Sequence, residues 1–99
     1  MGLSRVLKDQ VIFGKDQITS SDWVKYPIVR FADIPDAIDI TFVPPTAPAV
    51  PSGGIGEPSQ VPMPAALGNA FFDATGVRVR RPPFTPARVR AALKAAGVA

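Results

Sequence analysis

The middle of the chain places the strongest limit on its fold. Residues 44–63 show no hydrophobic periodicity and are interrupted by six prolines and three glycines. Proline fixes φ near −65° and lacks the amide donor that helix interiors and central strands require. A connection of this length greatly exceeds the usual four to six residues or so, and such loops are usually functional or disordered. We therefore expect one long irregular loop between two regions of different character.

The region before the loop is prone to form strands. Residues 3–10 have a short helical pattern, and residues 11–20 place a β-prone run on each side of a Gly-Lys-Asp turn, which predicts a β-hairpin. Residues 28–31 form a further short extended candidate. In residues 37–43 apolar and polar side chains alternate, the pattern of a half-buried strand.

The region after the loop is prone to form helices. Pro64 suits a first helical position, residues 65–75 carry one apolar face, and Gly76 suits the position after the helix. Residues 77–80 alternate as a short strand. Thr85-Pro86 is a helix-start signature, and the helix it begins is expected to end near Gly97. The predicted fold class is α+β: a small mixed domain with a β-hairpin, two to three further short strands, the long loop and two helices.

Composition excludes several classes of function. The 99 residues allow one domain, and the chain has no cysteine and no histidine. Disulfides, thiol nucleophiles, imidazole bases and Cys/His metal sites are therefore absent. No apolar run is long enough to span a bilayer, and no signal peptide is evident. Proton chemistry falls to carboxylates, lysines or Tyr26.

One carboxylate stands out. Glu57 is the only glutamate, and it lies between the glycines of residues 53–56 and Pro58. Glycine permits positive φ and close backbone approach, while proline restricts the chain that follows. A general base requires such a fixed mount together with partly dry surroundings. A solvated surface loop remains the alternative reading.

Two further stretches suggest binding instead of catalysis. Residues 44–51 contain two overlapping PxxP motifs, which dock in a polyproline II conformation on aromatic grooves but also occur in plain linkers. All eight acidic residues lie at or before Asp73, so the C-terminal quarter is basic. Nucleic-acid binding is not expected, because no aromatic residues are interleaved with these charges. A non-enzymatic interaction module is the alternative to an enzyme.

The glycine-glutamate-proline motif and its surroundings resemble a known family. The chain is similar to the C-terminal end of a molybdenum hydroxylase large subunit, of the xanthine dehydrogenase and aldehyde oxidase superfamily, and most closely to the isoquinoline 1-oxidoreductase β-subunit type. The stretches that carry the resemblance cover nearly the whole chain: residues 23–30, 34–35, 38–43, 53–58, 64–76 and 77–84.

The resemblance implies specific roles. Glu57 is expected to be the catalytic base, taking the proton of a metal-bound hydroxyl during hydroxylation of an aldehyde or N-heterocycle, with Gly54, Ile55 and Gly56 beside the cofactor. Residues 1–99 correspond to the C-terminal part of the molybdopterin-binding domain, and residues 44–63 to its active-site loop. The implied cofactor is molybdopterin, in its cytosine dinucleotide form.

The chain is much shorter than such a subunit, so a fragment is expected. It should be inactive and cofactor-free alone, and its partners should be the remainder of the subunit and a [2Fe-2S] subunit. Uncovered apolar surface should favour a homo-oligomer. The compartment stays open between bacterial cytoplasm and periplasm.

Overall fold

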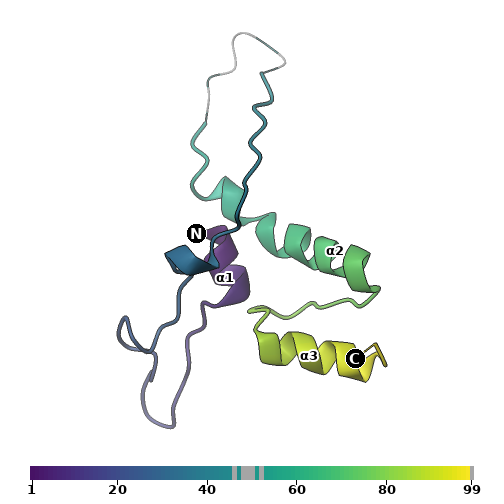
Figure 1. Ribbon diagram of the computed structural model, residues 1–99. Helices are drawn as coiled ribbons and strands as arrows, with labels where there is room; N and C mark the ends of the chain where they lie inside the picture. Colours follow the sequence, from purple (N-terminus) through teal and green to yellow (C-terminus); the bar gives the residue numbers. More distant parts are fainter. Residues whose placement is uncertain (46, 48–50, 52, 99) are drawn as a thin grey trace.

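The fold consists of helices joined by long irregular segments. The computed structural model describes residues 1–99 except 46, 48–50, 52 and 99. Along the chain it contains two short 3-10 helices and three α-helices: α1 (Gly2–Leu7), η1 (Phe31–Asp33), η2 (Pro58–Gln60), α2 (Met63–Thr75) and α3 (Pro86–Ala95), arranged as Figure 1 shows. The described residues contain no β-strand, only an isolated antiparallel bridge between Phe13 and Ile18. The predicted α+β class is therefore wrong.

The strand predictions fail because strands need partners. A helix satisfies its backbone groups internally, whereas a strand must pair with another one. In residues 11–20 the turn forms, with the Gly14 N–H donating to Gln17 O at 2.7 Å and the Thr19 N–H to Ile12 O at 2.9 Å. The next donor, the Ile12 N–H, bonds to the Ser20 hydroxyl instead of a backbone carbonyl. The hairpin ladder consequently stops.

The other predicted strands also lack a ladder. Residues 28–31, 37–43 and 77–80 belong to no strand. Residues 37–43 make no backbone hydrogen bond within the described structure, and their alternating Ile38, Ile40 and Phe42 side chains are exposed. The alternation is present in the sequence, but the described part of the chain contains no second strand to pair with it.

The two helices predicted after the loop are present, although α2 begins at Met63, so that Pro64 takes its second position instead of the first. Gly76 ends α2 in the left-handed region at φ 70°, and its N–H donates to Phe72 O at 2.7 Å. Glycine is favoured there because a Cβ is strained at positive φ. Thr85 caps α3, its hydroxyl accepting the Arg88 N–H at 3.4 Å, and Pro86 takes the first helical position.

A small core forms where α1 meets α2 and the segment before α3. Val6 of α1 is almost fully buried, and Val77 and Phe84 are the other buried large apolar residues among those described. The Phe84 N–H donates to Val6 O at 2.6 Å, which ties the two segments together. Gly2 lies so close to α2 that an added Cβ would come within 2.6 Å of the Met63 side chain. Glycine thus lets α1 approach α2.

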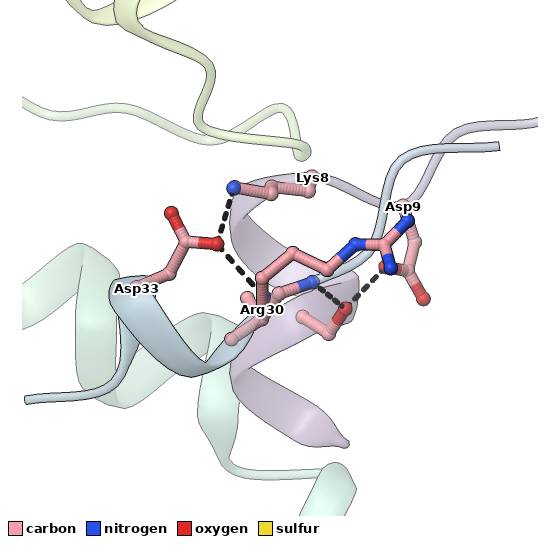
Figure 2. A network of polar contacts seen from close by, with 6 residues as sticks. Lys8, Asp9, Arg30 and Asp33 are labelled. Atoms are coloured by element: carbon pink, nitrogen blue, oxygen red, sulfur yellow. Dashed lines mark hydrogen bonds and ion pairs between the residues drawn. The ribbon is translucent and has the colours of Figure 1, made fainter. Parts of the chain in front are cut away.

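Polar contacts hold residues 29–33 against α1, as Figure 2 shows. The Ser4 hydroxyl donates to Asp9 at 2.6 Å and accepts the Val29 N–H at 2.9 Å. Asp33 accepts from the Lys8 ammonium at 2.6 Å and from the Arg30 N–H at 2.8 Å. The Lys8 hydrogen bond, followed by the Arg30 amide, lowers the pKa of Asp33 below its ordinary value of 3.8.

The chain is far more extended than a compact domain of its length. Its radius of gyration is 17.1 Å, whereas a compact chain of this length has about 13 Å. Its accessible surface is 8290 Å², against about 5,400 Å² for a compact protein of its mass. Many large apolar side chains, including Trp23, Phe31 and Phe42, are largely exposed. The core is therefore a small part of the molecule.

Candidate functional site

Glu57 lies at the start of η2, where a local turn fixes its backbone. The Gln60 N–H donates to Glu57 O at 2.9 Å, and the Ser59 N–H donates to Ile55 O at 3.3 Å. Two side chains converge on the carbonyl immediately before Glu57: the Ser59 hydroxyl at 2.9 Å and the Gln60 amide at 3.3 Å both donate to Gly56 O. The peptide that precedes the glutamate is thereby held from two directions.

The Glu57 side chain is not held by other described groups. Glu57 is exposed, and its side chain makes no hydrogen bond or ion pair with the described residues. The backbone of Glu57 is therefore held in place, as expected for a general base. The dry surroundings that a base also needs are not provided by the described part of the chain.

The neighbouring glycines are not required by the chain's own packing. Gly54 and Gly56 are not among the described glycines with positive φ, and an added Cβ at either would meet nothing within 4 Å. Ile55 between them is 79% exposed. Neither of these two glycines therefore uses the positive φ that glycine permits. The space that they leave is open to a group from outside the chain.

Glu57 also borders a pocket at the junction of α1, η2 and the start of α2. The pocket has a volume of about 490 Å³, which lies in the usual range for small-molecule sites. It is lined by two polar side chains besides Glu57, and by apolar groups: Arg5, Gln60, Gly2, Val6, Val61 and Pro64. The structure thus brings the N-terminal helix beside the motif that the sequence singled out.

Arg5 and Gln60 were missed by sequence reasoning. Arg5 lies far from Glu57 along the chain, and no motif connects the two. Gln60 follows Glu57 by three positions, which is about one turn of a helix. This spacing, which makes two side chains neighbours, was the only sign in the sequence that Gln60 lies near Glu57. Only the contact of α1 with η2 and α2 brings these side chains together.

The residues around Glu57 leave space for a group that the described part of the chain does not supply. No group of three or more metal-binding side chains occurs among the described residues. The open face at Gly54 and Gly56 leaves room for a bulky group, and the buried Gln60 Oε1 has no hydrogen-bond partner among the described groups. The residues present are therefore suited to contact a cofactor held by other parts of a protein.

Comparison with known proteins identifies the family. The chain is 48% identical over 94 residues to a subunit of the nicotinate dehydrogenase of Pseudomonas putida, a match that covers 95% of this chain and 8% of that protein. It is 37% identical over 93 residues to the membrane-bound aldehyde dehydrogenase [pyrroloquinoline-quinone] of Gluconacetobacter polyoxogenes, a match that covers 94% of this chain and 12% of that protein. The chain belongs to the molybdenum hydroxylase family.

A third molybdenum hydroxylase relative is the aldehyde oxidoreductase of Megalodesulfovibrio gigas, 42% identical over 72 residues, or 71% of this chain and 8% of that protein. The chain thus spans about a tenth of the length of these relatives. No family model matches it, and no solved structure matches it significantly.

The sequence analysis also considered the basic C-terminal quarter and the PxxP motifs of this molybdenum hydroxylase chain as binding sites. The Arg78 guanidinium lies 3.9 Å from the centre of the Phe72 ring and donates to Asn69 at 2.6 Å. Arg88 donates to Pro82 O at 2.8 Å and to Pro83 O at 3.2 Å. The PxxP motifs of residues 44–51 lie largely outside the described residues. No helix in the described part of the chain is long and apolar enough to cross a membrane.

Proposed function

We propose that the chain supplies Glu57 as the general base of a molybdopterin-dependent enzyme that hydroxylates aldehydes or N-heterocycles. The placement of Glu57 carries this proposal: its backbone is held by η2 and the residue lines a pocket of small-molecule size. Family membership supports the same assignment. Because the pocket is open and the chain spans about a tenth of its relatives, we propose that it is inactive alone.

In this role each residue of the loop has a physical task. A molybdenum cofactor, when bound, supplies the redox chemistry of hydroxylation. The Glu57 carboxylate accepts a proton at one of its Oε atoms, and the hydrogen bonds to Gly56 O hold the backbone that carries it. Gly54, Ile55 and Gly56 form the open face that contacts the cofactor, and covering this face removes water from around the carboxylate.

The partners in this proposal are the remainder of the molybdopterin-binding subunit and a [2Fe-2S] subunit, and the cofactor is the cytosine dinucleotide form. Residues 1–99 then form the C-terminal part of the molybdopterin-binding domain, with residues 44–63 as its active-site loop. The large accessible surface of the chain supports the proposal that it packs against a large partner. The excess of about 2,900 Å² over a compact protein of equal mass exceeds what a standard interface takes from one partner, about 800 Å².

The test is Glu57→Gln in the enzyme assembled with this chain. The substitution keeps the shape of the side chain but removes its basicity. We expect unchanged molybdenum content and a fall in turnover of several orders of magnitude. Asp73→Asn is the matched control, because it makes the same chemical change at an exposed carboxylate of α2. Near-normal turnover by the Glu57 variant would refute the role.

A further inference from the structure

Residues 37–43 form an unpaired edge of the molecule. In Figure 1 they run outward after η1 as one arm of the long loop that returns at η2. Among the described residues, the backbone N–H and C=O groups of this edge form no hydrogen bond. Pro35 and Pro44, which have no amide donor, bound the edge region on its two sides. A row of unpaired backbone donors and acceptors is a template for pairing with another strand.

The side chains of the edge alternate between apolar and polar. Its apolar side chains Ile38, Ile40 and Phe42 are between 66 and 89% exposed. Asp39 and Thr41 lie between them in the sequence. Because alternate side chains of a strand point to opposite faces, pairing of the edge aligns the three apolar side chains in one row.

The apolar row leads to a hollow beside α1. The hollow has a volume of about 590 Å³, and Ile38 forms part of its lining. Its walls also include the apolar side chains of Trp23, Ile28 and Ile34. An apolar hollow of this size has room for an aromatic ring. A large side chain that lies opposite Ile38 on a pairing strand would therefore be covered.

The order of side chains along the edge favours a second copy of the same chain as the partner. Antiparallel pairing centred on Ile40 places this residue opposite its own copy, and Phe42 opposite Ile38. Thr41 then lies opposite Asp39. Each apolar side chain of the row gains an apolar neighbour from the other copy, and no two carboxylates of the edge lie opposite each other.

The alternative pairings of two copies are less favourable. Centring the pair on Asp39 sets two carboxylates opposite each other, and parallel pairing in register places the same charges side by side. Centring it on Thr41 brings Pro44 opposite Ile38, where proline cannot donate to the ladder. The registers between these centres set polar side chains opposite apolar ones. The edge therefore specifies one pairing.

We propose that residues 37–43 are a self-complementary edge at which two copies of this chain pair antiparallel about Ile40, each placing Phe42 in the hollow beside Ile38 of the other copy. Two-fold symmetry forms both aromatic contacts at once. These contacts are needed because a two-stranded ribbon alone is only marginally stable in water. The pairing is a property of the chain itself and does not rest on the function proposed above.

Single cysteines test the register, because the natural chain contains none. Opposite residues of an antiparallel pair have Cα atoms about 4.5–5.5 Å apart, within the range of a disulfide. We therefore expect Ile40→Cys chains to link to each other on mild oxidation. Ile38→Cys chains should not link among themselves, because their thiols lie about 13 Å apart along the strands. In a mixture they should link to Phe42→Cys chains, which mass spectrometry identifies.

Sedimentation equilibrium measures the pairing of the natural chain without cysteines. We expect a reversible dimer, and Phe42→Asp should weaken it by about tenfold or more because the substitution places a charge in an apolar hollow. Phe31→Asp is the matched control. Phe31 is 92% exposed, similar to Phe42 at 89%, but it lies outside the edge and does not line the hollow. Circular dichroism checks that each variant keeps its helices.

Three results would overturn the proposal. The natural chain could stay monomeric at every concentration, which would leave residues 37–43 to a strand of a different protein. Phe42→Asp could dimerise as tightly as Phe31→Asp, or Ile38→Cys chains could link to themselves, as parallel pairing requires. None of these measurements involves turnover, so they are separate from the Glu57→Gln test of the proposed function.

Discussion

Replacing Gly68 with alanine should stabilise the chain, although Gly68 is buried in the middle of α2. An added Cβ would lie 3.5 Å from Val79 O and 3.8 and 3.9 Å from atoms of the Phe84 ring. These are ordinary van der Waals distances, so the methyl group fits without displacing its neighbours. Alanine in a helix interior is favoured over glycine by about 0.8–1 kcal/mol, and burial of the methyl adds up to about 0.8 kcal/mol.

The total gain is thus about 1–2 kcal/mol, which corresponds to a rise in Tm of roughly 4 °C or more for a domain of this size. Thermal and urea unfolding, followed by circular dichroism at 222 nm, measures it. Gly76→Ala is the control of opposite sign, because Gly76 has a φ of 70° where a Cβ costs roughly 1–2 kcal/mol. A loss of stability in Gly68→Ala would show that α2 packs on Phe84 more tightly than these distances state, and would refute the reasoning.

Other predictions concern α1 and α3. Gly2→Val should separate α1 from α2, because even the first added carbon meets the Met63 side chain at 2.6 Å, and the loss of methyl contacts between residues 2–6 and Met63 in NMR would show it. The depressed pKa of Asp33 means that its contact with Lys8 stabilises the fold above about pH 3.8 and is lost as pH falls through the lower folded-state pKa. Carboxyl NMR titration should show a higher Asp33 pKa in Lys8→Met, and an unchanged pKa would contradict the contact. Thr85→Ala should cost about 1 kcal/mol by removing the cap of α3, measured by the same unfolding assay.

Sequence reasoning succeeded where structure is determined locally. The ends of α2 and α3 follow from single residues: Gly76 accepts a left-handed conformation, and Thr85 with Pro86 starts a helix. These effects act within a few residues of the chain and need no knowledge of the rest. The boundaries of both helices could therefore be predicted to within a few positions.

It failed where structure depends on distant partners. The alternating pattern of residues 37–43 indicates a strand only if another strand lies beside it, and the chain supplies none in the described residues. Trp23, a large aromatic residue of the kind that usually packs against a core, is 79% exposed. In both cases the sequence records a preference for burial that the chain by itself does not satisfy.

The candidate site also combines a part that the local sequence predicts with a part that depends on distant contacts. Glu57 and its turn were recognisable from the motif, because glycine and proline determine local backbone geometry. Arg5 reaches the pocket only through the packing of α1 against η2 and α2, which no local pattern in the sequence encodes. Its contribution therefore became visible only in three dimensions.

The hydrogen bond from the Phe84 N–H to Val6 O also has a consequence for how the chain is made. A ribosome adds about 5–20 residues per second, so Val6 is synthesised roughly 4–16 s before Phe84. A six-residue helix is too short to persist alone in water, and α2, with 13 residues, is itself close to that limit. The helix α1 therefore depends on segments that are made later, η2, α2 and Phe84, and the pocket shared by Arg5 and Glu57 cannot form before them.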